Sequence, residues 1–196
     1  MLLVALSNKA IGLIVGGVIA LVVIILIVWI ISTRNSFVRL RNGADEAWAT
    51  IDVYLKKRYD LIPNLVETVK GYTKHESETL ENVIKARNMA MSAGTPDDKI
   101  DAENQLTGCL KTLFSLTEAY PDLKANSQFL SLQGQLESIE GDLAQSRKFY
   151  NAKVKAFNTK RELFPASIVA GIMHLKPRKY FELDSEEERK NIKVSF

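Results

Sequence analysis

The sequence predicts an all-α protein in which an N-terminal transmembrane helix continues into an antiparallel bundle of long helices. Three observations support this fold class. Residues 10–31 form a run of 22 residues without a charge. Apolar residues in most of the remaining chain recur at steps of three and four, which is the period of one helix face. No stretch of any length shows the alternation that marks a strand.

The uncharged run has the length and flanks of a membrane anchor. As a helix, 22 residues extend about 33 Å, enough to cross the hydrocarbon core of a bilayer. A cleaved signal peptide has a shorter apolar stretch and a small-residue cleavage site. This run instead ends at Trp29, Ile30 and Ile31 before Ser32-Thr33-Arg34. We therefore expect residues 1–9 to be a short leading segment and residues 10–31 to be an uncleaved transmembrane helix.

The charges beside the run predict its orientation. Lys9 and the terminal amine precede it, whereas Arg34, Arg39 and Arg41 follow it closely. Positive residues accumulate on the cytoplasmic side of single-pass proteins. The sequence thus favours a cytoplasmic C-terminal domain.

Small residues recur inside the run. Gly12, Gly16 and Ala20 are spaced by four, an arrangement that lets two membrane helices approach closely. Glycine is also common in membrane helices in general. These three residues are the candidate membrane-helix contact.

The first helices after the run follow from apolar spacing and from breakers. Residues 37–59 carry one apolar face. Pro63 predicts that this helix kinks, or that it ends and restarts with Asp60 as the new cap. The face is expected to resume over residues 65–84 and to close at Gly94 as a left-handed cap.

Two further helices have clear starts or regular faces. Thr95 precedes Pro96 and two aspartates, the pattern of a helix N-terminus, and Tyr120-Pro121 is expected to end that helix. Residues 127–160 show a heptad-like apolar spacing and predict a helix roughly 50 Å long. A short helix is expected over residues 166–173. We assign residues 32–183 to the bundle and residues 184–196 to an acidic tail, and we expect the chain from Tyr180 onward to be surface-bound or mobile.

Composition excludes several function classes. The net charge is +3, and no basic stripe predicts nucleic-acid binding. Cys109 is the only cysteine, so it cannot form an internal disulfide. His75 and His174 lie about a hundred residues apart, too few and too distant to predict a metal site. No glycine-rich phosphate loop is present. We expect no catalytic residues, no cofactor and no enzyme activity.

Several polar residues near the predicted helix faces form a candidate network. One interpretation is a ligand site between helices, and the other is a buried network that sets the helix register. The structural interpretation is favoured because polar groups near a core must be paired in any case. The candidates are Arg87, Glu118, Asn126, Glu140, Arg147 and Asn151.

These motifs together resemble the bacterial LemA family over about residues 36–183. The motifs that carry the resemblance are Arg58-Tyr59-Asp60-Leu61-Ile62-Pro63-Asn64-Leu65-Val66, Ala86-Arg87, the stretch Glu118 to Asn126, Phe129, Leu132-Gln133, Leu136, Glu140, the stretch Ser146 to Asn151, Val154, Phe157-Asn158, Pro165 and Tyr180-Phe181-Glu182. Tyr59 departs from the family pattern, which often has alanine there. The resemblance implies a single-pass bacterial inner-membrane protein with a helical bundle. It implies no enzyme activity and no established ligand, and some members are associated with building internal membrane compartments.

Three functions are compatible with the sequence. The leading hypothesis is a non-enzymatic scaffold that forms homo-oligomers in the lipid bilayer and organises or shapes it. The alternative is an adaptor or sensor for another membrane protein, such as a protease, with the acidic tail as its contact. A small-ligand binder or enzyme that uses the polar candidates is the third.

Overall fold

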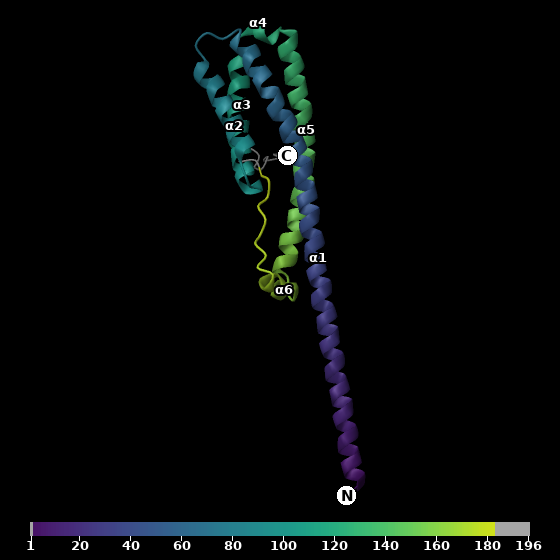
Figure 1. Ribbon diagram of the computed structural model, residues 1–196. Helices are drawn as coiled ribbons and strands as arrows, with labels where there is room; N and C mark the ends of the chain where they lie inside the picture. The colour runs from purple at the N-terminus through teal and green to yellow at the C-terminus, as the bar shows by residue number, and fades with distance from the viewer. Residues whose placement is uncertain (1, 183–196) are drawn as a thin grey trace, which may run out of the picture. The chain divides into compact units, whose positions relative to one another are not determined.

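The computed structural model describes residues 2–182 and is all-α, as the sequence predicts (Figure 1). Within this range it contains no strand. The helices are α1 (Leu2–Lys70), α2 (Ser77–Ser92), α3 (Pro96–Thr117), α4 (Pro121–Lys124), α5 (Ser127–Glu162) and α6 (Ala166–Ile172).

The chain divides into two compact units. The anchor unit comprises residues 1–43 and 155–178, and the bundle unit comprises residues 44–154 and 179–196. Helices α1 and α5 contribute to both units. The acidic residues Asp184, Glu186, Glu187 and Glu188 lie outside the described residues.

The anchor unit contains the candidate membrane run, residues 10–31, and a small apolar cluster. Among the described helices, α1 alone is long and apolar enough to cross a membrane, and no part of its most apolar window is buried. Phe37 packs edge-on against Phe157, with ring centroids 6.2 Å apart, and α6 covers this pair with Val169 and Ala170. Trp29 packs against the same cluster, which therefore lies beside the end of the uncharged run.

The bundle unit has a continuous apolar core between α1, α2, α3 and α5. Ile51, Leu106 and Leu113 are among its fully buried side chains. Thr95 accepts a hydrogen bond from the Asp98 amide at the start of α3, so the predicted N-cap is confirmed.

The end of the described chain packs into the bundle unit. Phe181 is buried, and its ring lies 5.9 Å from that of Trp48. The amide side chain of Asn151 holds the Phe181 backbone, accepting from its N–H at 2.8 Å and donating to its carbonyl at 3.1 Å. The expectation that the tail is surface-bound or mobile from Tyr180 onward is therefore wrong at Phe181.

Pro63 does not end the first helix, contrary to one of the two expectations. It lies inside α1, and Asp60 caps no new helix. A proline has no N–H to donate to the carbonyl four residues earlier, which here belongs to Tyr59. The Arg87 side chain on α2 supplies the missing donor, because its Nε lies 2.7 Å from the Tyr59 carbonyl oxygen. A tertiary contact thus replaces the backbone hydrogen bond that proline removes.

Two other expectations about this region are wrong. The predicted helix over residues 65–84 is interrupted, because α1 ends at Lys70 and α2 begins at Ser77. The polar residues between Val69 and Leu80 leave no apolar face to continue, and the chain reverses there. Gly94 is not a left-handed cap, since none of the described glycines has a positive φ; Ala93 ends α2 in an extended conformation instead.

We expect Arg87→Ala to destabilise the full-length protein by about 1–3 kcal/mol, because it leaves the Tyr59 carbonyl without a donor. In a Pro63→Ala background the cost should fall by about half or more, since an alanine N–H can make the helical hydrogen bond. Urea unfolding followed by circular dichroism measures both values. Lys85→Ala, an exposed change on the same helix, should stay within about 0.5 kcal/mol in either background. Equal costs of Arg87→Ala in the two backgrounds would contradict this explanation.

Candidate functional site

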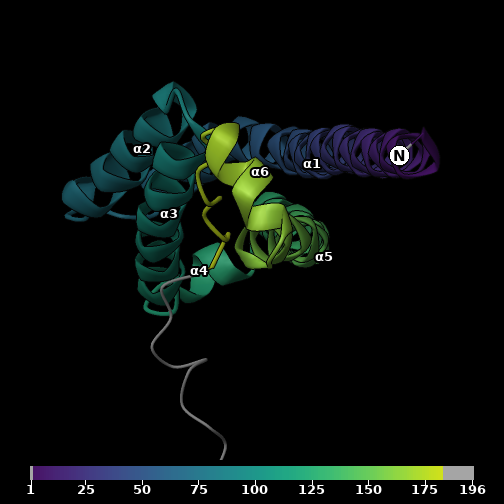
Figure 2. The ribbon, with the colours of Figure 1, turned by 90° about the horizontal axis from the view of Figure 1, so that it is seen from below.

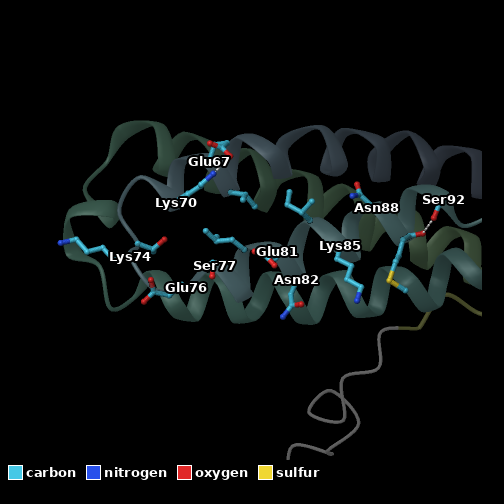
Figure 3. A pocket seen from close by; sticks show the side chains of 15 residues that line it. Glu67, Lys70, Lys74, Glu76, Ser77, Glu81, Asn82, Lys85, Asn88 and Ser92 are labelled. Carbon is cyan, nitrogen blue, oxygen red and sulfur yellow. Dashed lines mark hydrogen bonds and ion pairs between the residues drawn. The ribbon is translucent and has the colours of Figure 1, made fainter.

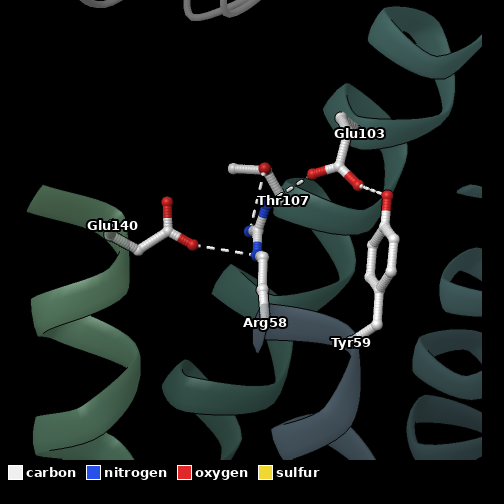
Figure 4. A network of polar contacts seen from close by, with 5 residues as sticks. All are labelled: Arg58, Tyr59, Glu103, Thr107 and Glu140. Carbon is white, nitrogen blue, oxygen red and sulfur yellow. Dashed lines mark hydrogen bonds and ion pairs between the residues drawn. The ribbon is translucent and has the colours of Figure 1, made fainter. Parts of the chain in front are cut away.

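A buried arginine lies at the centre of the bundle unit. Arg58 on α1 is 1% exposed, and three side chains contact its guanidinium (Figure 4). Nη1 donates to Glu103 Oε2 at 2.7 Å, and Nη2 donates to Thr107 Oγ1 at 3.1 Å. Nε lies 2.9 Å from Glu140 Oε1 on α5 as a charge contact. Arg58 therefore links three helices through one side chain.

Glu103 balances this charge from within the core. Its side chain is 0% exposed, and Tyr59 donates its hydroxyl to the other carboxylate oxygen. Burial raises the pKa of the Tyr59 phenol, and the nearby Glu103 carboxylate raises it further. The phenol therefore stays protonated and remains a donor to Glu103.

A second arginine completes the buried charged cluster. Arg147 on α5 is 6% exposed, and its guanidinium lies 4.4 Å from the centroid of the Phe181 ring. Burial lowers its pKa, and the neighbouring Arg58 charge lowers it as well, while Glu140 and Glu103 act in the opposite direction. Within the described residues, neither Nε nor Nη2 of Arg147 has a hydrogen-bond partner. The charged cluster consists of Arg58, Glu103, Arg147 and Glu140, of which Glu140 is 40% exposed. Its two arginines and two glutamates cancel in formal charge.

A cavity of about 620 Å³ lies beside this cluster, between α3 and α5. Its volume falls within the range of small-molecule sites, roughly 300–1,000 Å³. Leu110, Phe114 and Leu136 contribute apolar wall, while Arg58 and Glu140 contribute charge. The remaining lining residues are Asn104, Thr107, Gly108, Lys111, Thr117, Glu118, Lys124, Phe129, Gln133 and Glu137.

A larger hollow of about 1220 Å³ lies between the end of α1 and α2 (Figure 3). Exposed side chains such as Glu81, Asn82 and Lys85 line it. Its acidic and basic groups are solvated, and it has no buried charged pair. We therefore take the cavity between α3 and α5 as the candidate site.

The predicted polar candidates separate into two groups. Arg147 belongs to the charged cluster as a buried residue, and Glu140 contacts Arg58 from a side chain that is 40% exposed. Glu118 joins Glu140 in lining the cavity, where Glu118 pairs with Lys124 at 2.6 Å.

The other three candidates support the backbone. Arg87 donates to the Tyr59 carbonyl, and Asn151 holds Phe181. Asn126 caps α5 by accepting from the Phe129 amide at 2.9 Å. The six candidates therefore do not form one network.

Arg58 and Glu103, the two residues that matter most to this cluster, are not among the predicted polar candidates. Arg58 follows Leu55 by three and precedes Ile62 by four, so it occupies an apolar-face position of α1. Glu103 lies three residues from both Ile100 and Leu106 and occupies the same kind of position on α3. Opposite charges at apolar-face positions of two helices are the signal that could have identified the pair.

The candidate membrane-helix contact lies open in the single chain. Gly12, Gly16 and Ala20 are exposed on α1. A Cβ added at either glycine would meet no atom of this chain within 4 Å.

A family model and a curated relative both match the chain, and both point to the same family. The model of the LemA family matches residues 47–196. A curated relative, Protein LemA of Metamycoplasma hominis, is 25% identical over 169 residues, covering 84% of this chain and 75% of the relative.

We expect Arg58→Met to cost about 3–5 kcal/mol, because it leaves Glu103 as a buried carboxylate without its cation. The double variant Arg58→Met with Glu103→Gln should cost less than the sum of the single changes, by about 1–3 kcal/mol. The exposed pair Lys70 and Glu67, 3.6 Å apart, offers a matched control. Its coupling should be below about 0.5 kcal/mol. Additive costs at Arg58 and Glu103 in urea unfolding would show that the pair is not coupled.

Proposed function

The chain belongs to the LemA family, and we propose that it is a membrane-anchored, non-enzymatic helical scaffold that assembles with copies of itself and organises or shapes the membrane.

One observation carries the membrane part of this proposal. Apart from Trp29, the apolar side chains of residues 10–31 are uncovered by the rest of the described chain, with Leu13, Ile14 and Val28 all at least 60% exposed. Burial of such side chains away from water stabilises by about 25 cal/mol per Å². A bilayer of matching thickness supplies that burial without any partner protein. Trp29 at the end of the run suits the membrane–water interface.

The proposed location is the bacterial inner membrane with the bundle in the cytoplasm. Arg34, Arg39 and Arg41 follow the run directly, and positive residues at this place favour the cytoplasmic side.

The charges of the bundle unit give no support to nucleic-acid binding, since this unit carries 17 basic and 22 acidic residues.

Self-assembly is supported by the open face of Gly12, Gly16 and Ala20. Membrane helices with small residues at this spacing pack closely through van der Waals contacts. The adaptor alternative has no comparable support, because its candidate contact in the acidic tail lies outside the described residues.

We expect fluorescently labelled full-length protein in supported bilayers to bleach in several steps, and the number of steps should rise with surface density. Gly16→Leu should lower the association constant about tenfold, equivalent to about 1.4 kcal/mol, because a leucine keeps the helices apart. Val18→Leu is the control, since residue 18 lies on the opposite side of the helix from Gly16. Single-step bleaching at every density would overturn self-assembly.

The cavity favours a second candidate function, binding of an amphiphilic small molecule. Leu110, Phe114 and Leu136 suit an apolar body, and Glu118 and Glu140 suit a polar head at the same site. An amphiphile is a ligand class that a membrane-anchored protein meets at high local concentration.

We expect photoactivatable fatty amines to label peptides of α3 and α5 in the full-length protein, as mapped by mass spectrometry. Gly108→Leu should abolish this labelling, because Gly108 lines the cavity and a Cβ there meets no neighbour. Gly134→Leu is the matched control and should leave the labelling unchanged, since a Cβ at Gly134 also meets no neighbour but Gly134 does not line the cavity. Labelling that is unchanged by Gly108→Leu would exclude the cavity as the binding site.

A further inference from the structure

The anchor unit exposes apolar side chains outside its membrane run. Four of them gather at the turn from α5 to α6 and along α6, and we call them the α6 patch. They are Leu163 (58% exposed), Phe164 (81%), Ile168 (53%) and Ile172 (69%). Soluble proteins rarely leave such side chains contiguous in water, and a patch of this kind marks an interaction surface.

Helix α6 divides into two faces. Val169 and Ala170 are buried against the cluster of Phe37 and Phe157. Ile168 and Ile172, four residues apart, therefore share the outer face. The buried face holds α6 in place, so the outer face stays exposed without support from the rest of the described chain.

The patch lies beside the end of the membrane run. Trp29, two residues before the run ends, packs against the cluster that α6 covers. Lys160 at the end of α5 donates to the Ser36 hydroxyl, and its ammonium lies 5.5 Å from the centroid of the Phe37 ring. Figure 2 shows α6 next to the C-terminal end of α5, in the same unit as the N-terminal part of α1. This position matches the membrane–water interface of a bilayer that α1 crosses.

The charges of the anchor unit indicate the kind of surface that the patch contacts. Residues 32–43 and 155–178, which form the anchor unit beyond the run, carry eight basic residues and one acidic residue. Arg34 and Lys176 are exposed, and Arg161 is partly exposed. The acidic residue, Glu162, pairs with Arg161 at 3.2 Å. An excess of cations beside an apolar patch is the composition of segments that lie in anionic membrane interfaces.

We propose that the α6 patch inserts into the headgroup region of the same bilayer that α1 crosses, while basic residues of the anchor unit bind anionic phospholipid headgroups. This inference rests on the membrane anchoring proposed above and adds a second membrane contact. A second copy of the chain is a poorer occupant, because it would bring two strongly basic surfaces together. The second contact restricts rotation and tilt of the anchor unit at the membrane surface.

Site-specific fluorescence in reconstituted full-length protein tests the proposal. In a Cys109→Ala background, Phe164→Cys and Ile172→Cys carry an environment-sensitive fluorophore. The vesicles contain phosphatidylcholine and phosphatidylglycerol, with or without a nitroxide-labelled quencher lipid. We expect a blue-shifted emission at both positions and loss of most of that emission with the quencher. Vesicles of phosphatidylcholine alone should give a smaller blue shift, because the headgroup charge is absent.

Two control positions separate the failure of this inference from the failure of anchoring. Leu21→Cys lies in the membrane run at 58% exposure, and Phe149→Cys lies in the bundle unit at 55% exposure. Quenching at Leu21→Cys but not at Phe164→Cys overturns the α6 contact and leaves anchoring intact. Absence of quenching at Leu21→Cys overturns both. The probe at Phe164→Cys could also be shielded from water equally in detergent and in vesicles, with no quenching by lipid. That result assigns the patch to a second copy of the chain and also overturns the proposal.

Discussion

The bundle unit depends on one buried ion pair, Arg58 with Glu103. Both side chains are removed from water, and each satisfies the other at 2.7 Å. Desolvation of two charges costs several kcal/mol per ion, so the pair persists only because its remaining polar atoms also find partners. Thr107, Tyr59 and Glu140 provide them from α3, α1 and α5. The register of three helices is therefore set by a requirement that an apolar core would not impose.

Polar side chains also satisfy backbone groups at several places where the backbone departs from a regular helix. Arg87 supplies the hydrogen bond that Pro63 removes, and Asn126 supplies the cap of α5. Asn158 holds the returning chain in the anchor unit by bonding both the N–H and the carbonyl of Arg178, each at 2.9 Å. Polar side chains thus act mainly as substitutes for missing backbone partners. Glu118 and Glu140 differ from these residues because they line the cavity, which is large enough for a ligand.

Charge is unevenly divided between the two units. The anchor unit is strongly basic, whereas the bundle unit has more acidic than basic residues. The small net charge of the whole chain conceals this division. The anchor unit combines basic residues with an apolar run and an exposed apolar patch, which suits an anionic bilayer surface. The excess of acidic residues in the bundle unit is repelled by such a surface. This distribution supports the proposal that the anchor unit contacts the membrane and the bundle unit faces the solvent.

The sequence by itself determined the all-α class, the membrane run, the cap at Thr95 and the long helix α5, because each depends on local spacing or on one capping residue. Only the tertiary structure decided that α1 continues through Pro63, since the replacement donor on Arg87 is 28 residues from the Tyr59 carbonyl that accepts its hydrogen bond. The tertiary structure also decided which charges are buried, because Arg58 and Glu103 are 45 residues apart in the chain and meet only when α1 packs against α3. Neither has a partner until the helices pack, and the free energy of a buried charge depends on its neighbours in space rather than in the chain.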